Sequence, residues 1–176
     1  NENMKLINEG SIALDDGIDE ILTNLYGIKA IETSEESILK INQMKELMLK
    51  NTTTINTLTT QISSIKDIYI ENNLKDKTLD ELKDNKELQN IKTSYENTTS
   101  LIQLLQANNS ALEESLKTFE STSTSINDLI KTLEYIKGKT SYLEENITKV
   151  TEGVSAMDEK GSDLVAGVEE LNKGIA

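Results

Sequence analysis

Residues 70–81 read Ile70-Glu71-Asn72-Asn73-Leu74-Lys75-Asp76-Lys77-Thr78-Leu79-Asp80-Glu81, and they separate two long runs of heptad-spaced apolar residues. Asn72 and Asn73 favour a helix end and a turn, because a short amide side chain tolerates the left-handed backbone conformation. Thr78 followed by Glu81 has the spacing of a capping box, which marks a helix start. The stretch therefore predicts a reversal, at which one long helix ends and a second returns antiparallel to it.

The run before this stretch has apolar residues spaced alternately three and four apart, which is the pattern of a coiled-coil seam. The seam comprises Met4, Ile7, Ser11, Leu14, Ile18, Ile21, Leu25 and Ile28, then Ile41, Met44, Met48, Asn51, Ile55, Leu58, Ile62, Ile65 and Tyr69. Its phase slips between residues 30 and 41, where Thr33 and Glu36 could cap a new helix. A helix break there is an open alternative to one continuous helix.

The run after the stretch carries the seam almost to residue 176. It comprises Leu88, Ile91, Tyr95, Thr98, Ile102, Leu105, Asn109, Leu112, Leu116, Phe119, Ser123, Ile126, Ile130 and Leu133. After one skipped position, an irregularity of the heptad, it resumes as Ile136, Thr140, Leu143, Ile147, Val150, Val154, Met157, Gly161, Leu164, Val168, Leu171 and Ile175. Helix propensity is weak at residues 108–110, at 121–125 and at Gly138. An elongated up-and-down bundle with turns at these points is the alternative to a hairpin.

Polar residues in the seam indicate its register. If the chain folds back at residue 80, positions whose numbers sum to 160 face each other, so Asn51 meets Asn109 and Ser37 meets Ser123. Paired polar groups in an apolar seam fix the register of a coiled coil. The matches favour an all-α, long antiparallel helical hairpin that reverses near residues 72–85. We expect one elongated helical segment over 1–176, with a first arm at about 4–72, a tip at 73–85 and a second arm at about 86–175.

The composition narrows the fold and the function. The 176 residues include no Pro, Cys, His or Trp, and only 3% are aromatic, which predicts long uninterrupted helices around a narrow Ile and Leu core. Without His or Cys, the commonest acid–base catalyst and metal ligands are missing. The net charge of −13 argues against nucleic acid, which is bound mainly through Lys and Arg. The sequence therefore predicts a non-enzymatic protein with no cofactor.

The densest carboxylate cluster comprises Asp15, Asp16, Asp19 and Glu20. On a helix, Asp15 and Asp19 stand one turn apart, as do Asp16 and Glu20, so a divalent cation could bridge either pair. The spacing of a calcium-binding loop is absent, however. A solvated acidic face is the favoured interpretation, and no metal site is predicted.

Glycines recur at heptad spacing near both ends of the sequence, as Gly10 and Gly17 and as Gly153, Gly167 and Gly174. Each helical glycine costs about 1 kcal/mol relative to alanine. A repeat therefore suggests packing glycines, which let helix backbones approach closely beside the seam. The alternative is that these glycines mark frayed helix ends, although fraying does not require a period of seven.

Two of these segments, Gly10-Ser11-Ile12-Ala13-Leu14-Asp15-Asp16-Gly17 and Gly161-Ser162-Asp163-Leu164-Val165-Ala166-Gly167, resemble the L-x-x-G-x-x-x-L-x-x-G heptads of the YhgE/Pip family. This family comprises phage infection proteins of Gram-positive bacteria and their relatives, including a type VII secretion accessory protein. The resemblance implies an extracellular helical segment whose parent protein is anchored in the membrane at both ends. Residues 30–150 lack the glycine repeat, and phage adsorption is not carried over from them.

These features predict an extracellular coiled-coil stalk at the cell membrane, within or across the cell wall, that serves as a spacer or a binding surface. The partner would be a protein or a phage component, and a homodimer is compatible with the pattern. The predicted contact site is the tip, with Asn72, Asn73, Lys75, Asp76 and Lys77, because it is farthest from the membrane. A cytoplasmic coiled-coil scaffold or signalling hairpin is the alternative.

Overall fold

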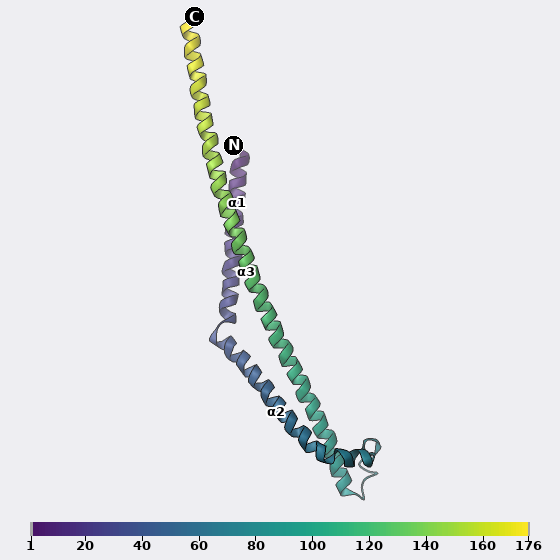
Figure 1. The fold of residues 1–176 in the computed structure, drawn as a ribbon. Helices are drawn as coiled ribbons and strands as arrows, with labels where there is room; N and C mark the ends of the chain where they lie inside the picture. The colour runs from purple at the N-terminus through teal and green to yellow at the C-terminus, as the bar shows by residue number, and fades with distance from the viewer. Residues whose placement is uncertain (1, 176) are drawn as a thin grey trace. The chain divides into compact units, whose positions relative to one another are not determined.

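A computed structural model describes residues 2–175 of the chain. The elements are α1 (Glu2–Glu32), α2 (Glu35–Glu71), the short 3-10 helix η1 (Leu74–Asp76) and α3 (Lys86–Ile175), coloured in chain order in Figure 1. No strand occurs among the described residues, which confirms the all-α prediction. Residues 108–110 and 121–125 and Gly138 are helical, so none of them provides the turn that an up-and-down bundle would need.

The chain divides into two compact units, which we describe separately. Unit 1 combines residues 1–30 with residues 124–176, and unit 2 consists of residues 31–123. In each unit one earlier helix runs antiparallel to part of α3. Two contacts in each unit establish this direction, because the residue number falls along α3 as it rises along the earlier helix. They are Asp19 with Lys137 and Tyr26 with Glu134 in unit 1, and Asn51 with Asn109 and Tyr69 with Glu96 in unit 2.

Unit 2 is an antiparallel hairpin formed by α2 and the first part of α3. Every seam position predicted for residues 41–69 is buried or half-buried, and so is every seam position predicted for residues 88–123. The Thr-rich residues 51–60 stay helical although threonine is a poor helix former. Ile55 and Leu58 face inward there, while hydroxyls such as that of Thr52 donate to the carbonyl four residues earlier, 2.9 Å away.

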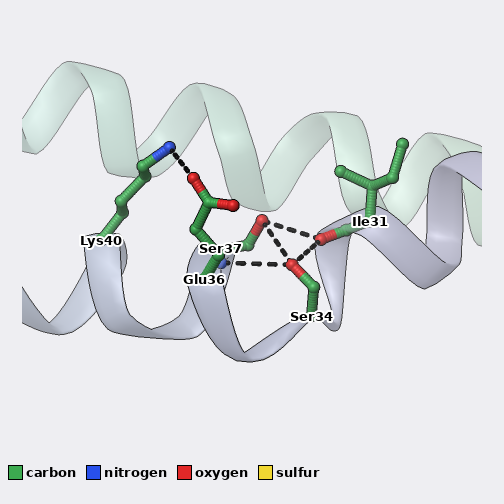
Figure 2. Close-up of polar contacts among 5 residues, drawn as sticks. All are labelled: Ile31, Ser34, Glu36, Ser37 and Lys40. Atoms are coloured by element: carbon green, nitrogen blue, oxygen red, sulfur yellow. Dashed lines mark hydrogen bonds and ion pairs between the residues drawn. The ribbon is translucent and has the colours of Figure 1, made fainter.

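The break between α1 and α2 is capped by two serines, as Figure 2 shows. Ser34 has an extended backbone (φ −65°, ψ 151°), and its Oγ accepts a hydrogen bond of 3.3 Å from the backbone N–H of Ser37. Both serine hydroxyls also donate to the Ile31 carbonyl, each at 2.7 Å. The chain therefore does break between residues 30 and 41, but Ser34 rather than Thr33 is the capping residue.

In unit 1 the two helices touch along a different stripe from the predicted one. The α1 residues that face α3 are Met4, Asn8, Ser11, Asp15, Ile18, Leu22 and Leu25. The seam prediction is wrong for Ile7, Leu14, Ile21 and Ile28, which are exposed. On α3 the heptad continues without a skip, so Lys137 and Glu144 face inward and the predicted Ile136, Leu143 and Val150 are exposed.

The rotation of this contact has a physical cause in the side chains that flank it. The buried core of unit 1 consists of Ile18, Leu22, Leu25 and Ile130, with Ile126 and Leu133 packed against it. Beside this core Lys137 donates to Asp19 and the Tyr26 hydroxyl donates to Glu134. Each helix carries more rows of apolar side chains than one partner helix can cover. The helices are rotated about their axes so that these polar contacts form, and the row with Ile21 on α1 and the row with Leu143 on α3 are left exposed.

Candidate functional site

The tip of unit 2, residues 72–85, begins where two asparagines end α2. The Asn72 side chain donates to the Ile68 carbonyl at 2.9 Å, and the Asn73 N–H donates to the Ile70 carbonyl at 2.9 Å. Asn73 is left-handed, with φ 49° and ψ 43°, and no other residue among 2–175 has positive φ. The two amides thus end the helix and turn the chain in the way that their chemistry predicts.

Thr78 and Glu81 form a reciprocal capping box. The Thr78 N–H donates to the Glu81 carboxylate at 2.6 Å, and the Glu81 N–H donates to Thr78 Oγ1 at 3.2 Å. These hydrogen bonds from the Thr78 backbone and hydroxyl lower the pKa of Glu81. The helix start expected at this box is absent, because residues 79–84 form turns only.

The second helix, α3, begins at Lys86. Asn85 is its cap, since Asn85 Oδ1 accepts a hydrogen bond of 3.1 Å from the Leu88 N–H and its carbonyl accepts one of 3.1 Å from the Gln89 N–H. The single turn after the capping box directs Leu82 into the protein, where only 5% of it is exposed. Leu82 is therefore buried by a turn that precedes α3, and not by the helix itself.

The tip has a hydrophobic core of its own. Leu74, which η1 carries inward, is completely buried. It clusters with Tyr69, Leu82 and Ile91, and Ile65, Leu88 and Tyr95 pack around them. The rings of Tyr69 and Tyr95 stack with centroids 4.2 Å apart and planes at 24°. The loop is therefore folded over the ends of both helices rather than merely joining them.

A buried lysine connects the loop backbone to α3. Lys92 is 8% exposed, and its ammonium donates to the Leu74 carbonyl at 2.8 Å and to Glu96 at 2.5 Å. Glu96 also accepts a hydrogen bond of 2.9 Å from the Tyr69 hydroxyl. The Lys92 ammonium lowers the pKa of Glu96, while burial together with Glu96 raises the pKa of Tyr69 to about 12.

The outer surface of the tip combines polar groups with exposed apolar side chains. Asn73, Lys75 and Asp76 are exposed, and Asn72 and Lys77 are half-buried. Ile70 and Leu79 are 60% and 48% exposed. The sequence pattern identified neither of these exposed apolar residues, and it did not identify Lys92 as a buried group. The only signal for Leu79 is an apolar residue placed between turn residues and outside any heptad.

Leu79 is held in place although it is exposed. Its carbonyl accepts a hydrogen bond of 2.7 Å from the side-chain amide of Gln89 on α3. An apolar side chain on a fixed backbone loses little conformational freedom when a partner covers it, so such a residue suits binding. Leu79 is therefore an exposed apolar side chain on a backbone that a hydrogen bond from α3 fixes.

Of the two polar pairs proposed to set the register, Asn51 and Asn109 are hydrogen-bonded to each other, whereas no hydrogen bond between Ser37 and Ser123 is described. The Asn51 side-chain amide donates to the Oδ1 atoms of Asn108 and Asn109, at 2.8 and 2.9 Å. The structure thus brings Asn51 and Asn109 together. The hydrogen bonds described for Ser37 run to Ile31 and Ser34 in the cap of α2, and Ser123 is half-buried on the α3 seam.

Replacing Asn51 with leucine is expected to lower the free energy of unfolding by about 1–3 kcal/mol, because the Oδ1 of Asn109 then loses its donor within the seam, although the Asn109 amide still donates to Met48 and Thr52. The double variant Asn51→Leu, Asn109→Leu should lose less than the sum of the two single variants, since both partners are then apolar. Urea unfolding followed by circular dichroism measures all four proteins. Simple additivity would show that the two amides do not stabilise each other.

Within residues 2–175, the glycines proposed for close packing make no such contact. A methyl group added at Gly10, Gly17, Gly153, Gly167 or Gly174 would meet no atom within 4 Å, and all five glycines are helical. Their heptad spacing therefore does not serve the contact between α1 and α3.

No group of three or more His, Cys, Asp or Glu residues within 2–175 is placed to hold a metal ion. Over the same range, no helix combines the length and apolar character needed to cross a membrane. Comparisons with known proteins add no relative, since no family, curated protein or solved structure matches the chain. The functional argument therefore rests on the chain's own residues.

Proposed function

We propose that the chain is a non-enzymatic extracellular helical stalk of a Gram-positive membrane protein, and that its tip is a binding surface for a protein partner. The observation that carries this proposal is the construction of the tip. A loop folded around a fully buried Leu74 presents Leu79 to solvent on a fixed backbone, and Ile70 in the last turn of α2 is exposed as well.

The length of the tip supports a role beyond chain reversal. Two antiparallel helices can be joined by about two to five residues, whereas fourteen residues separate Glu71 from Lys86. The additional residues form a compact loop with its own side-chain core. Compact surface loops of this kind are frequently functional, because a rigid scaffold positions them for contact.

The extracellular assignment rests on the resemblance of the terminal glycine heptads to the YhgE/Pip family. That resemblance favours a parent protein anchored in the membrane, for which the helices would serve as spacer. Within this family the partner would be a phage component or a part of an export system. The net charge of −13 suits contact with a basic or neutral protein surface rather than with an acidic one.

The location can be tested with a single cysteine at Lys75, because the chain has no cysteine of its own. The parent protein carrying Lys75→Cys is treated on intact cells with a membrane-impermeant maleimide. We expect labelling before lysis, with the unmodified parent protein as the background control. Labelling only after lysis would favour the cytoplasmic scaffold.

The contact can be tested with a photo-crosslinking residue at Leu79 in the same parent protein. A matched control carries the crosslinker at Gln103, which is exposed on α3 away from the tip. We expect a discrete crosslinked partner from position 79 only. A second variant, Ile70→Asp with the crosslinker at 79, should reduce its yield. Equal yields at positions 79 and 103 would remove the tip as the contact site.

A further inference from the structure

Three oxygen atoms in the contact between α1 and α3 of unit 1 are shielded from solvent and have no hydrogen-bond partner among the described residues. They are Ser11 Oγ, Asp15 Oδ1 and Glu144 Oε1. A buried polar atom that gives up water without gaining a partner destabilises the fold, so such atoms are rare in proteins. Three of them in one contact therefore require an explanation.

The antiparallel packing of the two helices brings the three oxygens to neighbouring levels. Lys137 donates to Asp19, which fixes the level of the two helices at that point. Glu144 lies two turns after Lys137 on α3, and Ser11 lies two turns before Asp19 on α1, so Ser11 and Glu144 lie level with each other. Asp15 lies one turn from Ser11 on the same side of α1. Only 5% of Ser11 is exposed, and both carboxylates are half-buried. We call Ser11, Asp15 and Glu144 the interhelical site.

Asp15 differs from the other carboxylates of the acidic cluster on α1. Asp16 and Glu20 are exposed, as a solvated acidic face requires, and Asp19 accepts a hydrogen bond from Lys137. Asp15 combines a position facing α3 with a buried oxygen that has no donor. Its carboxylate therefore belongs to the contact between the helices rather than to the solvated face.

The lysines of α3 on either side of the interhelical site are paired with other carboxylates. Lys137 donates to Asp19, and Lys149 pairs with Glu145 at 2.5 Å. The pKa of Lys137 is raised mainly by its hydrogen bond to Asp19, and the charge of Asp15 adds a smaller contribution. Lys137 thus lies near Asp15 but binds its neighbour. The two carboxylates of the interhelical site therefore keep negative charges that no ion pair within residues 2–175 neutralises.

The serine provides an independent indication of a ligand. A serine inside a helix commonly donates to the backbone carbonyl four residues earlier, and Ser63 and Ser115 do so at 2.7 and 2.8 Å. Ser11 makes no such hydrogen bond, although it is almost completely buried. Its hydroxyl has one proton for two carboxylates, which are acceptors only when ionised. Hydrogen bonds within the interhelical site therefore cannot satisfy all three oxygens, whereas one cation can bind them together.

We propose that Ser11, Asp15 and Glu144 bind a calcium ion that joins α1 to α3 in unit 1. The site offers oxygen ligands only, which suit a hard cation rather than zinc or copper. Calcium accepts about six to eight oxygens in irregular geometry, and water completes its shell where a site is half-open to solvent, as both carboxylates are here. With three protein ligands we expect weak binding, with a dissociation constant of about 0.1–1 mM.

Calorimetric titration of the 176-residue chain with calcium chloride at constant ionic strength tests the site. We expect one site per chain, and Asp15→Asn or Glu144→Gln should weaken binding at least about tenfold. Asp16→Asn is the matched control, because it removes the same charge from the exposed side of the same helix. It should change the dissociation constant less than about twofold, since solvent screens that charge. No binding up to about 10 mM calcium, or equal weakening by Asp15→Asn and Asp16→Asn, would overturn the proposal.

Thermal unfolding followed by circular dichroism separates a ligand from a structural role of the carboxylates. Calcium should raise the unfolding midpoint of the unmodified chain by at least about 2 °C, because it binds the folded state, and it should leave Asp15→Asn unchanged. Without calcium, Asp15→Asn should be at least as stable as the unmodified chain, since a buried charge without a partner is removed. A less stable variant without calcium, or an equal shift with magnesium chloride, would contradict a calcium site. Neither result depends on whether the tip binds a partner.

Discussion

Replacing Leu74 with alanine is expected to lower the free energy of unfolding of unit 2 by about 2–5 kcal/mol. Leu74 is completely buried among Tyr69, Leu82 and Ile91. Truncation removes its burial and leaves a cavity between two helix ends and a loop whose backbone is fixed by hydrogen bonds, so the site has little freedom to collapse. Urea unfolding followed by circular dichroism measures the loss.

The matched control for this variant is Leu79→Ala, which truncates an exposed leucine in the same loop. It should change the free energy of unfolding by less than about 0.5 kcal/mol. Because the tip lies at one end of unit 2, its loss can also appear as local opening. Amide exchange should therefore accelerate at Lys77, whose N–H donates to the Leu74 carbonyl at 3.3 Å, in Leu74→Ala only. Similar effects of the two variants would contradict a core at the tip.

The hairpin of unit 2 could be predicted from sequence because one helix faces one partner along a single seam. Every inward position from residue 41 to 69 follows the heptad, and the polar exception, Asn51, has a polar partner at Asn109. Pattern and pairing agree there, so periodicity overrides the weak helix propensity of the threonines.

Unit 1 could not be predicted in the same way, because its helices have more apolar rows than one contact uses. Either Ile21 or Leu22 of α1 could face inward beside Ile18, and periodicity favoured Ile21. The structure buries Leu22. The choice depends on contacts across helices, such as Lys137 with Asp19, and a heptad count along one helix contains no information about them. Ile7, Leu143 and Val150 of these unused rows line an apolar groove in unit 1.

The tip was located by its turn residues, but its interior could not be predicted. Leu74 lies outside any heptad, and its burial depends on the chain turning at Asn73 and returning. Lys92 resembles a solvent-facing lysine of a helix, and only the position of the Leu74 carbonyl makes it a buried donor. The capping box at Thr78 forms as its spacing predicts, yet local hydrogen bonding does not decide whether a helix or a single turn follows.

Replacing Lys92 with methionine is expected to lower the free energy of unfolding at neutral pH by about 2–3 kcal/mol. Methionine keeps most of the apolar stem of the lysine, so the loss reports the ammonium. The Leu74 carbonyl would then keep only the longer hydrogen bond, 3.3 Å, from the Lys77 N–H, at a cost of about 1 kcal/mol, and Glu96 would lose the ammonium that it accepts from at 2.5 Å. Lys117→Met, at an exposed position on the same helix, should have little effect.

The pH dependence separates the loss at the carboxylate from the loss at the carbonyl. In the unmodified chain the pKa of Glu96 lies below its ordinary value of 4.5, chiefly because of the hydrogen bond from Lys92. A depressed folded-state pKa contributes stability that is present above the unfolded-state pKa and lost as the pH falls through the folded-state pKa. Urea unfolding between pH 7 and about pH 3 should therefore show that the free energy of unfolding of the unmodified chain falls toward that of Lys92→Met as Glu96 is protonated. The difference that remains at low pH reports the contacts of Lys92 that do not titrate, chiefly its hydrogen bond to the Leu74 carbonyl. A gap that stays constant across this range would mean that the ion pair with Glu96 contributes nothing, and that Lys92 acts only by holding the loop backbone.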